Sequence, residues 1–270
     1  MMTKNILVDL KNVEKYISNY DHMILSIDLD DAWWMNALND STAYKIKSNI
    51  QTLALKPFIT SVVISTKPSN MLFKEFGLRE LLYAGNHGLD ILYHGSQAVN
   101  HDSLGKHGVI AGFYHEIDSL VSSYQGLSIT KKNYSVQIGL RGGTSVFPEK
   151  FLIEIRKILA GYPNISMIHS RKILEFTIAG IFQKAAIHSR IQKFLGKSNT
   201  LELYIGNHFI SHRKIAENCD MLAVSLNRAM PSYSDYHLDD MEDLRIFLNW
   251  LNESDCVNYF VPGYLKCQLN

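Results

Sequence analysis

Residues 22–31 read HMILSIDLDD, and this stretch decides the fold class. The segment His22–Asp28 is a short apolar run that ends in acids, and such a run predicts a buried β-strand. Asp28, Asp30 and Asp31 come at its end. In an α/β sheet this places three carboxylates at the carboxyl end of a strand, where ligands bind. Because crowded acids repel one another, a cation would be their natural neighbour.

Strands and helices alternate to either side of this stretch. The expected helices are 42–54, 71–76, 149–159, 183–195 and 240–251, and the expected strands are 61–65, 82–88 with its glycine-rich turn, 126–129, 134–141, 165–168, 172–176, 201–205 and 222–226. Strand, helix, strand, helix, strand in the first part of the chain is typical of a parallel α/β sheet.

The middle of the chain departs from this alternation. It has the order strand, strand, helix, strand, strand, which indicates an α+β sub-domain. We therefore predict an α/β core with a parallel sheet, built from residues 1–108 and 179–270 and interrupted by an α+β domain at 109–178.

Composition narrows the class of protein without naming a function. The 270 residues are 46% hydrophobic, enough to form a core, and the net charge of +1 gives no electrostatic footprint for nucleic acid. No apolar stretch approaches the ~18 residues that span a bilayer, and the amino terminus lacks the apolar run of a signal peptide. We expect a soluble, cytoplasmic protein with no membrane or nucleic-acid partner.

The three cysteines of the chain lack the spacing of metal ligands. Free thiols are expected for Cys256 and Cys267, although these two could pair.

Several polar residues at strand ends are candidates for chemistry. Asp28 and Asp30, two apart on an extended segment, suit a nucleophile and a general acid/base; the alternative is a polar turn with an Asp cap. Ser65 could hold a phosphate oxygen or cap a helix. Lys184, taken alone, reads as a surface lysine.

The order of these residues resembles the haloacid dehalogenase superfamily, and more closely its trehalose-6-phosphate phosphatase family. Residues 65–68 (STKP) look like the family's S-G-R-P, and residues 84–90 (AGNHGLD) look like its A-G-(S/N)-H-G-L-E. Residues 133–141 are similar to its strand K-x-x-S-V-x-V-H-Y-R, and residues 235–251 to its last helix. The resemblance spans about residues 23–251. It implies a Rossmann-like core of the superfamily type, with the inserted α+β domain as a cap.

The resemblance also implies roles for single residues. Asp28 would form an aspartyl-phosphate, and Asp30 would protonate the leaving sugar oxygen and then activate water. The other residues to which it gives a role are Ser65, Lys67 and Lys184 for the phosphate, Asn86, His87, Arg141 and Glu175 for the substrate and cap, and Asp28, Asp30 and Asn207 for Mg²⁺.

The chain departs from the family where the metal should bind. The family's G-D-D-x-T-D-E corresponds here to residues 206–212, GNHFISH, so that Asn207, His208 and Ser211 stand where acids are expected. A hard divalent cation depends on the negative charge of such acids.

Two functions are compatible with this sequence. One is a phosphatase acting on trehalose 6-phosphate or a related sugar phosphate. The alternative is an inactive pseudo-phosphatase that binds a sugar phosphate or a trehalose-phosphate synthase partner.

Overall fold

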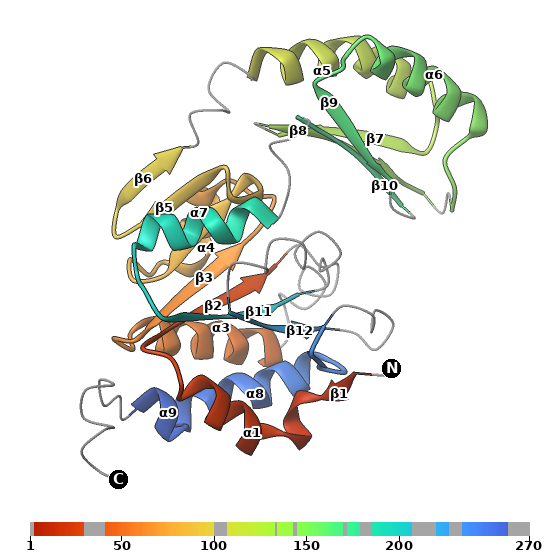
Figure 1. The fold of residues 1–270 in the computed structure, drawn as a ribbon. Helices are drawn as coiled ribbons and strands as arrows, with labels where there is room; N and C mark the ends of the chain where they lie inside the picture. Colours follow the sequence, from red (N-terminus) through yellow and green to blue (C-terminus); the bar gives the residue numbers. More distant parts are fainter. Residues whose placement is uncertain are drawn as a thin grey trace. The chain divides into compact units, whose positions relative to one another are not determined.

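Strand β2 (His22–Asp28) lies inside a nine-stranded sheet, and all seven of its residues are buried. The computed structural model describes residues 3–29, 41–99, 107–132, 134–142, 145–169, 172–178, 185–206, 220–226 and 234–258. The chain forms two units, the first made of Met1–Ala98 with Lys184–Asn270 and the second of Val99–Gln183. Figure 1 shows both with their helices and strands. The domain limits predicted from the sequence, 109 and 178, fall inside the second unit.

The sheet of the first unit has the order β1-β13-β12-β11-β2-β3-β4-β5-β6. Its other strands are β1 (Lys4–Asn5), β3 (Ile59–Ile64), β4 (Leu82–Gly85), β5 (Asp90–Tyr93), β6 (Ser96–Val99), β11 (Thr200–Ile205), β12 (Met221–Ser225) and β13 (Tyr236–His237). Strands β1 to β4 and β11 to β13 pair in parallel, and β5 pairs antiparallel to β4. The predicted parallel α/β sheet is therefore confirmed.

Helices cover both faces of this sheet, as Figure 1 shows for α1, α3 and α8 on one side and α7 on the other. The elements are η1 (Ile6–Val8), α1 (Leu10–Ile17), α3 (Ser41–Ala54), α4 (Ser69–Phe76), η2 (Asn86–Gly88), α7 (Ala185–Leu195), α8 (Met241–Glu253) and α9 (Asp255–Asn258). Apolar residues of α1, α3, α4 and α8 form one core with β2, β3 and β11. Residues Ile187 and Ile191 of α7 form a second core on the opposite face.

The second unit is a four-stranded antiparallel sheet with two helices. Its elements are α5 (His107–Ser122), β7 (Leu127–Lys131), β8 (Ser135–Leu140), α6 (Glu149–Ala160), β9 (Ile165–His169) and β10 (Ile173–Ile178), with strand order β7-β8-β10-β9. Both helices lie on the same face of this sheet (Figure 1). Phe113 of α5 packs on Phe176 of β10, with ring centroids 5.0 Å apart, so this unit has its own apolar core.

The sequence-based expectations missed several elements. The sequence did not lead us to expect helix α5, helix α1, strand β1 or the hairpin of β5 and β6. The hairpin turns at His94 and Gly95, which both have positive φ, 51° and 80°. Such a turn joins two adjacent antiparallel strands. The strand direction first reverses between β4 and β5, which the short turn η2 connects.

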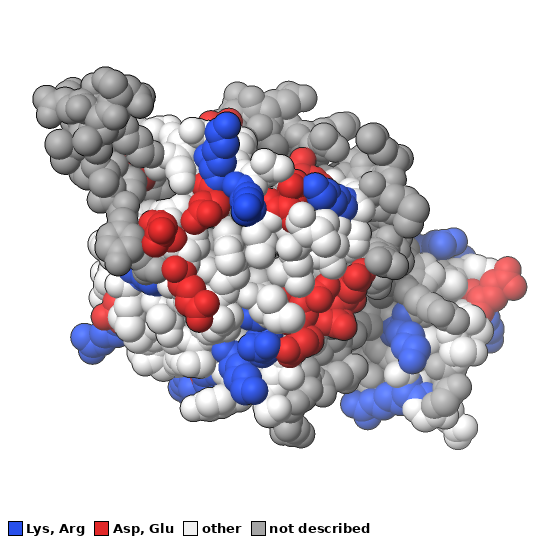
Figure 2. Space-filling model, turned by 90° about the horizontal axis from the view of Figure 1, so that it is seen from below, with Lys and Arg blue, Asp and Glu red and all other residues white. Residues whose placement is uncertain are grey.

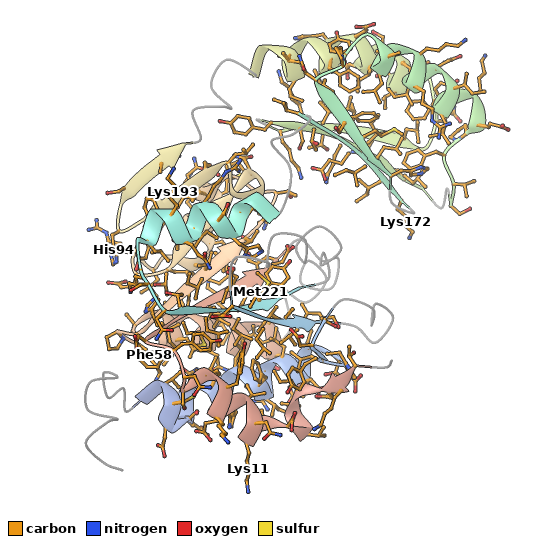
Figure 3. All side chains as sticks on the ribbon, in the orientation of Figure 1. Lys11, Phe58, His94, Lys172, Lys193 and Met221 are labelled. Atoms are coloured by element: carbon orange, nitrogen blue, oxygen red, sulfur yellow. The ribbon has the colours of Figure 1, made fainter. Side chains whose placement is uncertain are left out.

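Charged side chains of both signs share the surface. Figure 2 shows Lys and Arg side chains lying among clusters of Asp and Glu on one face, in agreement with the nearly balanced composition. In Figure 3 the side chains fill the space between sheet and helices, whereas Lys11 on α1 points outward. Among the described residues no helix has the length and apolar content needed to cross a bilayer. Cys256 is a free thiol.

Candidate functional site

Two of the predicted site residues lie side by side at the carboxyl edge of the main sheet. Asp28 is the last residue of β2 and pairs in register with Ile64, the last residue of β3. Ser65 follows at once, and its backbone N–H donates to the carbonyl of Ala84 on β4. Asp28 and Ser65 are each only 2% exposed. The parallel pairing of β2, β3 and β4 thus brings Asp28 and Ser65 to the same edge of the sheet, and both residues are buried there.

A tyrosine from the neighbouring strand reaches the Asp28 carboxylate. The Tyr204 hydroxyl, on β11, donates a hydrogen bond of 3.1 Å to Asp28 Oδ2, and both side chains are buried. Gly206 follows β11 at the same edge. A Cβ at this position would lie 2.8 Å from Asp28 Cβ and 2.8 Å from the Tyr204 hydroxyl oxygen. Close packing of these three residues therefore requires glycine at 206.

A second buried polar group lies on the same sheet face, under helix α7. The Glu202 carboxylate on β11 accepts a 2.7 Å hydrogen bond from the Ser26 hydroxyl and contacts His188 Nδ1 on α7. The His188 ring in turn meets the Tyr204 ring edge to face, with centroids 5.2 Å apart. All four side chains are buried. The face of the sheet below α7 thus carries a polar cluster that ends at Asp28.

Ser65 and Lys67 form a tight turn after β3. The Lys67 backbone N–H donates to Ser65 Oγ at 3.1 Å, and the Lys67 carbonyl accepts from the Asn86 backbone N–H at 2.9 Å. The Lys67 ammonium forms a 2.9 Å ion pair with Glu75 on α4. The structure therefore brings the Lys67 and Asn86 backbones together, while the Lys67 side chain is engaged by a carboxylate.

The turn that contains Asn86 and His87 follows a glycine that has no room for a side chain. A Cβ at Gly85 would lie 2.1 Å from the Ser69 nitrogen and 2.4 Å from Asp90 Oδ1. Asn86 has a positive φ of 48°, a conformation that Asn tolerates better than most residues. This geometry explains two residues of the sequence AGNH: Gly85, which has no room for a Cβ, and Asn86, which tolerates the positive φ.

Asp90 anchors this turn to helix α4. Its Oδ2 atom accepts hydrogen bonds from the Ser69 backbone N–H at 3.1 Å and from the Ser69 hydroxyl at 3.0 Å, so that it caps the first turn of α4. Burial raises the pKa of Asp90, while hydrogen bonds from Ser69 and Asn86 act in the opposite direction. Asp90, which matches the last position of the family motif, thus makes a structural contact: it holds the first turn of α4 through Ser69.

The two predicted cap residues belong to the second unit. Glu175 lies on β10, where it pairs with Gln137 on β8 and Ile168 on β9. Val136, Leu174 and Phe176 lie on the buried face of this sheet. Glu175, Gln137 and Ile168 lie on the opposite face. Arg141 follows β8 and is exposed. Their role in substrate binding stays a prediction.

The remaining predicted site residues lie outside the described part of the chain. They are Asp30, Lys184 and Asn207; His208 and Ser211, which stand where the family has acids, also lie outside it, and for His87 the structure describes the backbone alone. Among the described residues no group of three or more His, Cys, Asp or Glu could hold a metal ion. Asp28 is the only predicted Mg²⁺ ligand that is described, so the fit of a metal to this site is not established.

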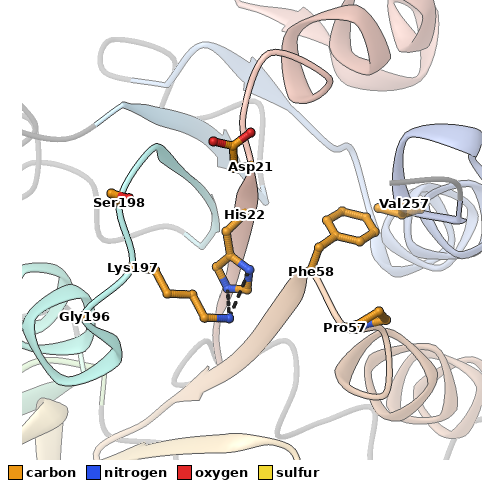
Figure 4. Close-up of a pocket in the computed structure, with 8 residues that line it drawn as sticks. All are labelled: Asp21, His22, Pro57, Phe58, Gly196, Lys197, Ser198 and Val257. Carbon is orange, nitrogen blue, oxygen red and sulfur yellow. Dashed lines mark hydrogen bonds between the residues drawn. The ribbon is translucent and has the colours of Figure 1, made fainter. Parts of the chain in front are cut away.

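A separate pocket of about 590 Å³ opens at the amino-terminal edge of the sheet (Figure 4). His22 lines it and lies 2.9 Å from the Thr60 hydroxyl, with the Lys197 ammonium 3.2 Å from its ring nitrogens. Burial, and then the charge of Lys197, lower the pKa of His22 to about 4. Because β2 separates His22 from Asp28 by six residue steps, or about 20 Å, this pocket is not part of the site at the carboxyl edge.

Sequence reasoning missed Tyr204, Glu202 and His188. One signal was present: Glu202 and Tyr204 alternate with Leu201, Leu203 and Ile205 along a strand, which puts both polar residues on one face. Alternation does not reveal which residue of another strand or helix stands opposite. The contact of Tyr204 with Asp28 could be found only in three dimensions.

Comparisons with known proteins agree with this architecture. No family model matches the chain. The chain is 26% identical over 170 residues to probable trehalose-phosphate phosphatase 3 of Oryza sativa subsp. japonica, covering 56% of this chain and 46% of that protein. It is 23% identical over 213 residues to trehalose 6-phosphate phosphatase RA3 of Zea mays, covering 71% and 58%. The aligned part thus spans about half the length of these curated relatives.

Solved structures share the fold over most of the chain. Trehalose-6-phosphate phosphatase of Aspergillus fumigatus, in crystal form 3, superposes with a TM-score of 0.65 at 18% identity, covering 93% of this chain and 99% of that one. The trehalose synthase regulatory protein C-terminal domain of Candida albicans gives 0.60 at 12% identity, with 88% and 97% covered. A haloacid dehalogenase-like hydrolase from Bacteroides thetaiotaomicron gives 0.55 at 12% identity, with 85% and 99% covered.

Proposed function

We propose that this chain, a homologue of the trehalose-6-phosphate phosphatases with the haloacid dehalogenase-like fold, is a phosphohydrolase that removes phosphate from trehalose 6-phosphate or a related sugar phosphate. The observation that carries the proposal is the buried Asp28 carboxylate at the carboxyl end of β2, beside Ser65 at the end of β3. Ligands of open α/β sheets bind at this edge. The proposed substrate, a sugar phosphate, is inferred from the similarity of the chain to trehalose-phosphate phosphatases.

In this proposal Asp28 is the nucleophile. One carboxylate oxygen attacks phosphorus, the bond between phosphorus and the sugar oxygen breaks, and Asp30 gives a proton to the departing oxygen. Water then attacks the aspartyl-phosphate with Asp30 as base, which releases phosphate and restores Asp28. Ser65, Lys67 and Lys184 would hold the phosphoryl oxygens, and fixed donors of this kind stabilise the transition state. Asn86, His87, Arg141 and Glu175 would contact the sugar or close the site.

Mg²⁺ would be held by Asp28, Asp30 and Asn207, and when bound it would neutralise charge on the phosphoryl group. Of these three ligands, Asp28 is the one that the structure describes. Loss of ligand charge around Asn207 could cost about 4 kcal/mol of transition-state stabilisation, or about three decades of rate.

A second function is favoured by that same loss of charge. The residues at 207, 208 and 211 are Asn, His and Ser, and one structural neighbour is named as a regulatory protein of trehalose synthase. In this alternative the chain binds a sugar phosphate or a trehalose-phosphate synthase without hydrolysis, and it acts as a regulator.

Phosphate release separates the two functions. The purified protein would be incubated with trehalose 6-phosphate and Mg²⁺, Mn²⁺ or Co²⁺, beside an Asp28→Asn variant. Asp21→Asn is the matched control, because Asp21 is an exposed carboxylate at the other end of β2, where its Oδ2 atom accepts a hydrogen bond from Asn199. We expect release by the wild type and by the control, and none by Asp28→Asn. Equal rates in all three proteins would exclude the proposed nucleophile.

Calorimetric titration with trehalose 6-phosphate completes the test. Binding without phosphate release would support the regulatory function and contradict the hydrolase. A double variant, Asn207→Asp with Ser211→Asp, returns carboxylates to the metal site. If charge is all that the site lacks, this variant should release phosphate faster than the wild type in Mg²⁺.

A further inference from the structure

Tyr204 is placed to act on Asp28. Its hydroxyl donates to Asp28 Oδ2 at 3.1 Å, although the two residues are 176 positions apart in the sequence. In the sheet, Tyr204 pairs with Ser26, two residues before Asp28 on the same strand face. The ring therefore lies along β2 and delivers its hydroxyl to the strand end where the carboxylate stands.

The surroundings of Tyr204 hold this hydroxyl in one place. The ring is fully buried among Ile24, Ile64 and Ile187 in the core below α7. It meets the His188 ring edge to face, with an interplanar angle of 82°. Beyond the hydroxyl, the Gly206 backbone leaves no room for even a Cβ. A group confined in this way loses little conformational freedom when it donates a hydrogen bond, so the bond can fix its acceptor.

His188 is itself fixed from the sheet side. Its Nδ1 atom contacts the Glu202 carboxylate, which also accepts a hydrogen bond from Ser26. Glu202 and Tyr204 stand two residues apart on the same face of β11. The order Ser26, Glu202, His188, Tyr204, Asp28 is thus a continuous series of contacts between buried side chains.

We propose that Tyr204 is a positioning residue for Asp28: the Tyr204 hydroxyl holds Oδ2 and so orients Oδ1 for attack on phosphorus. This inference rests on the proposed function of Asp28.

The same hydrogen bond favours the second half of the reaction. When Oδ1 bonds to phosphorus, Oδ2 becomes the carbonyl oxygen of the aspartyl-phosphate, which is a weaker acceptor than a carboxylate oxygen. Water then attacks phosphorus, the bond between phosphorus and Oδ1 breaks, and the electron pair returns to the carboxylate. The Tyr204 hydroxyl regains its charged partner at this step, so it promotes hydrolysis of the intermediate.

The variant Tyr204→Phe removes the hydroxyl and leaves the ring. We expect kcat for trehalose 6-phosphate to fall about tenfold to a hundredfold, the range for a hydrogen bond to a charged group. Because hydrolysis of the intermediate slows, KM should fall with it, and acid-quenched enzyme should carry more covalent phosphate than the wild type. Unchanged kcat and KM would overturn the proposal.

Tyr83→Phe is the matched control. Tyr83 is equally buried, on β4, and its hydroxyl donates to the Leu78 carbonyl at 2.7 Å, away from Asp28. This variant should lose stability to a similar degree yet keep the wild-type kcat and KM. If both variants changed the kinetics alike, Tyr204 would have only a structural role.

A second readout does not need activity. Crystal structures of the wild type, Tyr204→Phe and Tyr83→Phe would show the Asp28 rotamer. We expect one rotamer in the wild type and in the control, and a changed or split one in Tyr204→Phe. If the wild type releases no phosphate, the proposed hydrolase fails while this measurement still decides the positioning role; an unchanged Asp28 rotamer in Tyr204→Phe would overturn it.

Discussion

At the scale of single residues, parallel pairing explains why Asp28 and Ser65 could be placed from the sequence. Both follow apolar runs, and the carboxyl ends of parallel strands meet at one edge, so their proximity follows from the strand pattern alone. The contact of Tyr204 with Asp28 does not follow, because it depends on which strand lies on the other side of β2. That neighbour is β11, which lies more than 170 residues later in the chain.

Gly85 offers the sharpest steric test of the site. Gly85→Ala would place a Cβ 2.1 Å from the Ser69 nitrogen and 2.7 Å from the Pro68 carbonyl carbon, both backbone atoms. We expect a loss of about 3 kcal/mol or more in the free energy of unfolding, at the upper end for single substitutions. Gly112→Ala is the control: its nearest atom is 3.8 Å away, within a helix, so it should stabilise by up to about 1 kcal/mol. Urea unfolding measures both, and equal stability of the two variants would contradict the clash.

His22 gives a prediction about pH. Its pKa is lowered to about 4 by burial and by the nearby Lys197, from an ordinary value of 6.5. Between these two pH values the unfolded chain binds a proton that the folded chain does not, so stability falls as pH drops through this window. The loss from this group approaches about 3 kcal/mol at the lower end.

The variant His22→Gln removes that titration and keeps a side chain that can bond to Thr60. The free energy of unfolding, measured by urea at pH 7, 5.5 and 4.5, should vary less steeply with pH than in the wild type. His115→Gln is the control, since His115 is exposed on α5, and it should follow the wild-type curve. A curve for His22→Gln parallel to the wild type would show that His22 does not titrate as expected.

At the scale of elements, apolar periodicity predicts most of the core helices and strands. The predicted helix at 42–54 is α3, and the predicted helix at 71–76 is most of α4, which ends in a left-handed cap at Gly77 with φ 74°. Helix α5 was missed although Ile110, Phe113 and Ile117 have helical spacing, because Gly108 and Gly112 weaken its propensity. The pattern that specified the helix was therefore present, but tertiary packing outweighs the cost of its glycines.

Helix α7 is tied to the sheet by a buried polar contact that a double-mutant cycle can measure. His188→Leu leaves the Glu202 carboxylate buried without its imidazole partner, and Glu202→Leu removes the partner of His188. Each single variant should cost about 3–5 kcal/mol, the range for breaking a buried pair. The double variant should cost less than the sum, because two apolar side chains can replace the pair. Strictly additive losses in urea unfolding would mean that the two side chains do not interact.

At the scale of the whole molecule, the two units have separate cores, and this predicts separate local stabilities. Phe176→Ala removes a buried ring of the second unit that packs on Phe113, and Phe247→Ala removes a buried ring of α8 in the first unit. Each truncation should cost about 3–5 kcal/mol within its own unit. Amide hydrogen exchange followed by mass spectrometry reports such losses region by region.

We expect Phe176→Ala to accelerate exchange in β7, β8, β9 and β10 while β2, β3 and β11 keep their protection. Phe247→Ala should accelerate exchange in β2, β3 and β11 while β7, β8, β9 and β10 keep their protection. The reason is that each ring contacts residues of its own unit, so the cavity it leaves relaxes there. Loss of protection in both units after either substitution would show that they unfold together. A second unit that folds independently of the first could change in sequence without loss of the strands that present Asp28 and Ser65.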